Sequence, residues 1–207
     1  MSQPRPRRPR KPQVRQAQQA RSKATVHAIV EASARILAED SWAALNTNAI
    51  AQRAGVSVGS IYEYFPDKQA IVDVILDQHL SKGEGMLAEA ARNLKGVHDV
   101  GVLVAALVHG FVQVHSDNPR LHRALSSEAE LSKAQRQRVS ALRNGVIMLV
   151  AEALSGQVDK PSLKATLLVD TADALAHRWL IDDVGLPVKP ETLAAEAIKM
   201  LGGYVSS

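Results

Sequence analysis

The sequence predicts an all-α protein, with a small N-terminal unit of three helices, a connecting helix and a larger helical body. In each long segment of the 207-residue chain, apolar residues recur every three or four positions, which is the spacing of one helix face. No alternating run of apolar and polar residues is long enough to indicate a strand, and glycine and proline mark the breaks between segments. With 46% hydrophobic residues, the chain can bury a core of its own.

The first helix is expected from about Ser22 to Glu39, with a break at Asp40–Ser41. Trp42 and Leu45 are then expected to pack as the chain turns. The face of this helix that is predicted to be buried consists of Val26, Ile29, Val30, Ser33, Ile36 and Leu37.

Two short helices separated by a glycine are expected next. Thr47 is expected to cap the second helix, which ends near Gly55, where a left-handed backbone favours a residue without a side chain. The third helix runs from about Ser57, as its cap, to Phe65, with Ile61 facing the interior. This pattern is a helix-turn-helix, in which the outer side of the second of the two helices commonly enters the major groove of DNA.

The remaining elements are also expected to be helical. Pro66–Asp67 ends the third helix and starts a fourth at Lys68, which is expected to weaken near Gly83 and Gly85. Asn118–Pro119 is one of the later breaks. Further helices are expected near 86–95, 99–116, 119–127, 132–155, 161–183 and 191–204.

The net charge of +4 is unevenly distributed. Residues 1–23 hold eight Lys or Arg and no acid, which leaves 17 basic against 21 acidic residues in the rest of the chain. We expect residues 1–20 to be a disordered basic arm, because prolines forbid a regular helix and few apolar residues can anchor the segment. A solubilising tail is the alternative, but a segment that directly precedes a helix-turn-helix favours phosphate binding. The prolines are Pro4, Pro6, Pro9 and Pro12.

Composition excludes several kinds of site. The chain has no cysteine, which rules out disulfides and thiolate metal sites and is compatible with a cytoplasmic location. No apolar run approaches the length of about 20 residues that a membrane-spanning helix needs. The basic N-terminus is not followed by an apolar segment, so it does not read as a secretory signal, and no membrane partner is expected.

Three stretches resemble the TetR/AcrR family of transcriptional regulators: ARSKATVHAIVEASARILAE, TNAIAQRAGVSVGSIYEYF and PDKQAIVDVIL. They follow the order and spacing of that family and cover about a quarter of the chain. The resemblance implies a DNA-binding domain over residues 21–68 and a helical effector-binding and dimerisation domain over residues 69–207. One departure is Ser41, which stands where the family usually has glycine and is expected to strain that turn.

The resemblance also implies which residues contact DNA. Phosphate contacts are implied for Thr47, Tyr62 and Lys68. Tyr62 and Tyr64 can alternatively be packing residues. Thr47 is expected to cap its helix whether or not it contacts DNA. The chemistry of the remaining positions suits base contacts, since small, hydroxyl and apolar groups can approach base edges and thymine methyls. Those implied base or groove contacts come from Val58, Gly59, Ser60 and Tyr64.

The predicted DNA-binding domain carries little positive charge. Residues 24–68 contain three basic residues against five acidic ones. We therefore hypothesise that the basic arm supplies much of the salt-dependent affinity for DNA.

One recognition helix reads only a few base pairs, so the expected partners are double-stranded palindromic operator DNA and a second copy of the chain. The last two long helices are candidates for the dimer interface, although their residues can equally belong to the core of one chain. The candidate interface residues are Leu163, Leu167, Thr171, Ala174, Leu175, Leu193, Ala197 and Leu201.

The resemblance also implies a pocket for a small-molecule effector within the helical body. Polar or bulky side chains in otherwise apolar helices are the candidates to line it. Each can also be a surface residue or a buried polar residue with its own partner. The candidates are His109, Phe111, Gln113, His115, Met148, Asp170, Asp173, His177 and Trp179.

Three alternatives stay open beside an effector-released repressor. Asp173 and His177 are four residues apart, with His109 and His115 upstream, which allows an enzyme or a metal-sensing regulator. Such pairs on helices are common by chance, so neither an enzymatic activity nor a metal or cofactor is expected. A non-specific DNA-binding protein driven by the basic arm is the third alternative.

Overall fold

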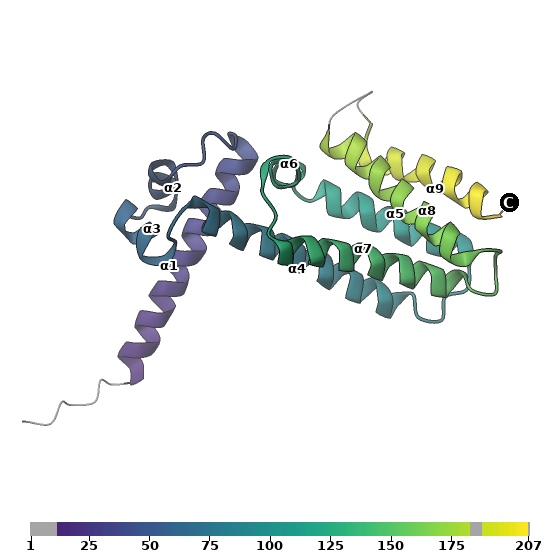
Figure 1. Cartoon of the computed structure of the whole chain (residues 1–207), viewed down its shortest axis with the longest axis horizontal. Helices are drawn as coiled ribbons and strands as arrows, with labels where there is room; N and C mark the ends of the chain where they lie inside the picture. Colours follow the sequence, from purple (N-terminus) through teal and green to yellow (C-terminus); the bar gives the residue numbers. More distant parts are fainter. Residues whose placement is uncertain (1–11, 183–187, 207) are drawn as a thin grey trace, which may run out of the picture.

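The computed structural model describes residues 12–182 and 188–206, and these residues form helices and turns without a strand. An N-terminal unit at one end is joined by the long helix α4 to a helical body at the other (Figure 1). The elements are α1 (Pro12–Glu39), α2 (Thr47–Ala54), α3 (Val58–Tyr64), α4 (Lys68–Asn93), α5 (Val100–Ser116), α6 (Pro119–Glu128), α7 (Lys133–Leu154), α8 (Pro161–Ala176), the π-helical turn η1 (His177–Ile181) and α9 (Pro190–Ser206). The predicted all-α class is confirmed.

Helix α1 begins earlier than expected. It starts at Pro12, so residues 12–20 are helical, and the expectation that they belong to a disordered arm is wrong. A proline is tolerated in the first turn of a helix because the N–H that it lacks has no partner there. The glutamine, arginine and alanine residues that follow are good helix formers. The rest of the expected arm, residues 1–11, lies outside the described residues.

The N-terminal unit has its own apolar core. Ile29 and Ile36 of α1 pack there with Ile50 of α2 and Ile61 of α3, all almost completely buried. Helix α6, which follows α5 in the chain, also contributes Ala124 and Leu125 to this core. The N-terminal unit is therefore held partly by an element from the second half of the sequence.

Helix α4 is continuous, which corrects the expected weakening near Gly83 and Gly85 and the separate helix near 86–95. A glycine in a helix costs about 1 kcal/mol relative to alanine, and packing against α7 outweighs that cost here. The Arg138 guanidinium of α7 donates to Glu84 at 2.8 Å and to Asp77 at 3.0 Å. Several points along α4 are thus fixed to α7.

The helical body encloses a second core, in which α5, α7, α8 and α9 pack together. The bounds of these helices lie within one or two residues of those expected. The helix expected over 161–183 is α8 continued by the wider turn η1. Lys160, just before α8, has the left-handed φ of 46°, which closes the turn after α7.

Within residues 12–182 and 188–206, no single helix is long and apolar enough to cross a membrane. Helices α5 and α6 pass the test of length and composition only as a pair, and they are bent by 84° relative to each other. Each packs inside the protein, since Leu107 of α5 lies in the second core and Leu125 of α6 in the first.

Candidate nucleic-acid interface

The helix-turn-helix is defined by local hydrogen bonds at both ends of α2. Asn46 caps the helix by accepting the N–H of Ala49 at 3.0 Å, so the expectation that Thr47 is the cap is wrong by one residue. An asparagine side chain reaches the free N–H groups of a first helical turn as well as threonine does. Gly55 ends α2 with a φ of 68°, as predicted, and its N–H bonds to the Ala51 carbonyl.

The start of α3 is fixed by a serine pair. Ser57 caps the helix by accepting the N–H of Ser60 at 3.0 Å, and the two hydroxyls lie 2.8 Å apart. Ile61 is 1% exposed and attaches the inner face of α3 to the core. The register of α3 is therefore set by one buried residue and one cap, which turns the opposite face outward.

The predicted base and phosphate contacts occupy different depths of this outer face. Tyr62 is 55% exposed, and Gly59 has only the Ser57 hydroxyl, at 3.7 Å, near the place where a Cβ would stand. Val58 and Tyr64 are half-buried and pack against the N-terminal core, and Ser60 is half-buried at the helix start. The structure thus gathers these five residues on α3, with Tyr62 standing out furthest.

Two further predicted contacts flank α3. Thr47 is the first residue of α2 and is half-buried, whereas Lys68 is the first residue of α4 and is exposed. The Lys68 ammonium lies 5.9 Å from the centre of the Trp42 ring. A cation over an aromatic face gains a modest stabilisation, so this contact places the charge of Lys68 beside the helix-turn-helix.

Two arginines of this unit are paired with acids. Arg53 donates to Glu39 at 2.8 Å and lies 3.5 Å from Asp40, and Arg35 lies 3.3 Å from Glu31. These pairs neutralise positive charge that would otherwise attract a phosphate backbone. Helices α2 and α3 therefore offer a shaped face with little free positive charge.

The turn after α1 accommodates Ser41, which corrects the expected strain. Ser41 does not have a positive φ, and its hydroxyl accepts the N–H of Ala44 at 3.1 Å. The serine thus replaces the freedom of a glycine with a hydrogen bond that closes the turn.

The predicted effector-site residues are spread over the helical body. His109 and Gln113 are exposed on α5, Phe111 is half-buried against the second core, and Met148 of α7 is 72% exposed. Asp170 of α8 is paired with Arg143 of α7 at 2.7 Å. His115 of α5 lies close to two other candidates, since Asp173 of α8 is 3.5 Å away and the ring centre of His177 in η1 is 5.8 Å away. Trp179 is also in η1.

Four histidine rings from four elements meet there, and we call them the histidine cluster: His79 of α4, His115 of α5, His122 of α6 and His177 of η1. The ring centre of His122 lies 4.7 Å from that of His115, 5.0 Å from His79 and 5.7 Å from His177. The sequence pattern does not single out His79 or His122. His122 follows His115 on the next helix, but only packing between helices brings its ring and that of His79 to the other two.

Burial controls the charge of this cluster. Burial lowers the pKa of His122 to about 3, with the neighbouring imidazoles acting in the same direction. Burial also lowers the pKa values of His79 and His115, although the Phe111 carbonyl and Asp173 partly oppose it at His115. These three imidazoles are therefore neutral near pH 7. Among the described side chains, no three His, Asp or Glu are arranged to hold a metal ion.

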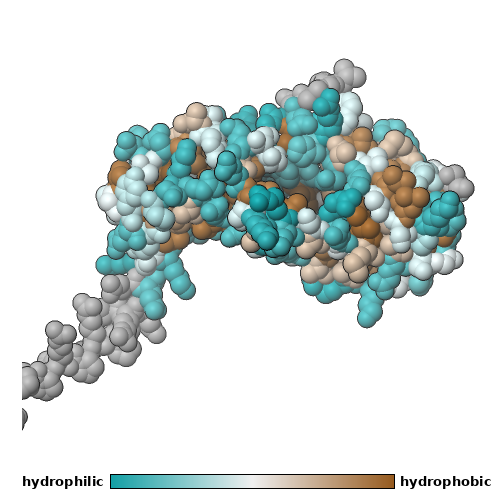
Figure 2. Space-filling model, in the orientation of Figure 1, coloured by the Kyte–Doolittle hydropathy of each residue, from teal (hydrophilic) through white to brown (hydrophobic). Residues whose placement is uncertain are grey.

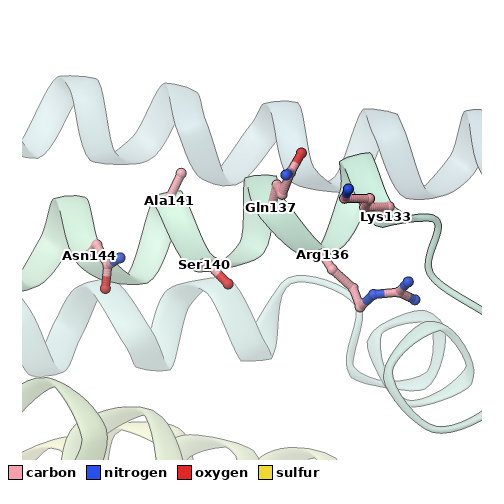
Figure 3. Close-up of a pocket in the computed structure, with 6 residues that line it drawn as sticks. All are labelled: Lys133, Arg136, Gln137, Ser140, Ala141 and Asn144. Carbon is pink, nitrogen blue, oxygen red and sulfur yellow. The ribbon is translucent and has the colours of Figure 1, made fainter.

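A surface cavity of about 430 Å³ lies along α7. Its lining residues project from α7, and Figure 3 shows Gln137 and Ala141 on one side of the helix and Arg136 and Ser140 on the other. None of the predicted effector-site residues lines it. The lining residues are Lys133, Arg136, Gln137, Ser140, Ala141 and Asn144.

Two family models match the chain. The family described as bacterial regulatory proteins, tetR family, matches residues 29–75, which include the whole helix-turn-helix. The family described as tetracyclin repressor-like, C-terminal domain, matches residues 101–204, about half of the chain. The two matches follow the division into an N-terminal unit and a helical body.

Individual proteins agree with these matches. The transcriptional regulator UidR of Escherichia coli is 24% identical over 188 residues, which cover 86% of this chain and 92% of UidR. TtgR of Pseudomonas putida is 28% identical over 167 residues, covering 74% of this chain and 79% of TtgR. The structure of FadR from Bacillus subtilis in complex with stearoyl-CoA shares the fold with a TM-score of 0.61 at 19% identity, over 87% of this chain and 97% of that one.

Proposed function

Since the chain belongs to the TetR family of ligand-responsive, DNA-binding transcriptional regulators, we propose that it is a repressor that binds a palindromic operator as a homodimer and leaves it when a small-molecule effector binds. The observation that carries this proposal is the outer face of α3. Ile61 fixes the inner face, Ser57 caps the helix start, and Tyr62 stands outward. These features support insertion of α3 into a major groove.

Exposed apolar side chains on the helical body support dimerisation. Leu163 and Leu167 of α8 are 54% and 44% exposed, and Met200 of α9 is 52% exposed. Apolar residues are visible on the surface of the helical body in Figure 2. Two copies that join through α8 and α9 bury these groups and carry two α3 helices to the two halves of an operator.

The proposed interface differs from the one expected from sequence in its α9 residues. Ala197 and Leu201 lie in the second core, and Leu193 is 9% exposed, so these three side chains pack within one chain. The face of α9 that remains for a partner therefore includes Met200 instead.

We propose that the basic N-terminal segment supplies the electrostatic affinity for the phosphate backbone. Arg35 and Arg53 are paired with carboxylates inside the N-terminal unit, which supports an external source of positive charge. Because α1 begins at Pro12, Arg21 and Lys23 are presented on a helix and are exposed. Each phosphate that this segment neutralises adds about −0.9 to the slope of log affinity against log salt.

Release is proposed to act through α4. This helix runs without interruption from Lys68, beside the helix-turn-helix, to Asn93 in the helical body. An effector that prefers a shifted position of α4 changes the separation of the two α3 helices and favours release. The stearoyl-CoA complex of FadR supports ligand binding within this fold.

The test is selection of bound sequences from a random duplex library by the full-length protein, followed by titration of the enriched duplex. A palindromic site bound by two copies, at least about 10³-fold more tightly than random duplex, is the expected result. Equal affinity for random duplex contradicts the proposal and favours a non-specific DNA-binding protein. A panel of candidate metabolites is then added to the complex, and release by one of them identifies the effector class.

A further inference from the structure

The histidine cluster lies at the joint between the two parts of the protein. It takes one ring from α4, which connects the parts, one from α5, one from η1 and one from α6. Helix α6 faces both ways, because Ala124 and Leu125 lie in the N-terminal core and His122 lies in the cluster. One short helix therefore contacts both the N-terminal core and the histidine cluster.

A second contact ties α6 to η1. The Arg123 guanidinium donates a hydrogen bond to the carbonyl of Ile181, the last residue of η1. His122, the residue before it, faces the ring of His177 in the same turn. Two neighbouring residues thus attach α6 to η1, Arg123 through a hydrogen bond and His122 through a ring contact.

The side chain of His122 lacks a hydrogen-bond partner at one ring nitrogen. Its Nδ1 atom is buried without a hydrogen bond, whereas the Nδ1 atom of His115 lies 2.8 Å from the Phe111 carbonyl oxygen. A buried polar atom without a partner is costly, and it becomes costlier still if the ring gains a charge.

The charged groups around the cluster do not supply a carboxylate to His122. From α8, Asp173 lies 3.5 Å from His115, and Asp182 lies 3.5 Å from His177. Lys82 of α4 is paired with Asp117, next to His79. The contact of α6 with the N-terminal core is apolar. His122 accordingly faces three other imidazoles and no counter-ion of its own among the described side chains.

We propose that the histidine cluster is a proton-sensitive joint, in which protonation of His122 separates α6 from α4, α5 and η1 and so loosens the attachment of the N-terminal unit. The His122 ring centre lies 4.7–5.7 Å from those of the three other histidines, so the cluster cannot share positive charge without repulsion. The neutral cluster is the packed one, and the protonated ring is accommodated only when it reaches water.

The direction of the response follows from linkage. The pKa of His122 is lowered to about 3 in the packed cluster, mainly by burial, whereas a free histidine has a value near 6.5. Between those values the open joint binds a proton that the packed joint does not. Acidification from about pH 7.5 to about 5.5 should therefore favour the open joint about tenfold through this one residue.

The test measures amide hydrogen exchange of the full-length protein at about pH 7.5 and about pH 5.5, corrected for the intrinsic effect of pH on exchange. Opening of α6 and η1 should increase about tenfold at the lower pH. The His122→Phe variant, which keeps an aromatic ring but cannot take up a proton, should lose this increase. His98→Phe, at an exposed position between α4 and α5, is the matched control and should retain it.

Equal protection of α6 at the two pH values in the wild-type protein overturns the proposal, whatever the variants do. If His122→Phe does not fold, histidine NMR of the wild-type protein decides instead. A cluster imidazole that titrates near 6.5, the value of a free histidine, without opening of α6, also overturns it. Neither measurement involves DNA, so failure to bind an operator contradicts the proposed function and leaves this test intact.

Discussion

The ammonium of Lys68 lies 5.9 Å from the centre of the Trp42 ring, which links the first residue of α4 to the turn that follows α1. This contact joins two segments that flank the helix-turn-helix without being part of it. It holds a positive charge beside α3, whereas Arg35 and Arg53 are paired with acids. We therefore predict that Lys68 neutralises a phosphate.

Lys68→Ala should weaken binding to every duplex alike, since a phosphate contact carries no sequence information. Loss of one phosphate contact should reduce the steepness of log affinity against log salt by about 0.9. Fluorescence anisotropy over a series of salt concentrations measures both quantities. Lys95→Ala, at an exposed position in the turn after α4, is the control, and an unchanged salt slope in Lys68→Ala contradicts the assignment.

Ser60→Ala should instead change which sites are preferred. The Ser60 hydroxyl lies near the start of α3, 2.8 Å from that of Ser57. It can bond to a base edge without disturbing the buried Ile61. Loss of a base contact typically costs about 1–3 kcal/mol at one position of the site. Repeating the sequence selection with the variant, beside Ser127→Ala on α6, should show relaxed preference at one base pair in each half-site. If the variant prefers the same sequences as the wild-type protein, Ser60 does not contact a base.

How far sequence can predict this structure depends on the range of the interactions. The helix-turn-helix is predictable because Ser57, Gly55 and Asp67 act on backbone atoms within a few residues. The continuity of α4 is not predictable in this way, because its two glycines favour a break. The hydrogen bonds that Arg138 of α7 makes beside these glycines come from a distant part of the chain. The start of α1 is hard to place because a proline that commonly breaks a helix is here its first residue, Pro12.

The candidate sites divide in the same way. The residues of α3 are neighbours in sequence, so one motif includes them all. The histidine cluster draws one residue from each of four elements, and His79 and His122 are 43 positions apart in the chain. Periodicity within one helix cannot reveal such a grouping, because it depends on how α4, α5, α6 and η1 pack together.

Two glycine substitutions should have opposite effects on stability. Gly55 has a φ of 68°, so Gly55→Ala should destabilise the protein by about 1–2 kcal/mol. Gly85 lies inside α4 with nothing within 4 Å of the position that a methyl group would take, so Gly85→Ala should stabilise by about 1 kcal/mol. Urea denaturation of both variants measures the two changes. A loss of stability in Gly85→Ala would falsify the view that α4 is an ordinary continuous helix there.

Leu167→Glu should convert the protein to a monomer. Leu167 is 44% exposed on α8, and a charge at the centre of an apolar dimer interface is buried without a partner. Val102→Glu, at a 50% exposed position on α5, is the matched control and should remain dimeric. Sedimentation velocity at micromolar concentration distinguishes the two. A wild-type protein that is strictly monomeric and still binds its operator contradicts dimerisation altogether.

Global stability should fall as the pH decreases from about 7 to about 5, because of the buried histidines. The pKa of His122 is about 3 in the folded protein and near 6.5 in the unfolded chain, so between these values only the unfolded chain binds the proton. The stabilisation is complete above about pH 6.5 and is lost progressively below it, by about 2 kcal/mol at pH 5 for this residue. The lowered pKa values of His79 and His115 act in the same direction. Urea midpoints at the two pH values should differ accordingly in the wild-type protein and less in His122→Phe. Because the carboxylates of the chain remain largely ionised at about pH 5, equal midpoints would mean that His122 is hydrated rather than buried.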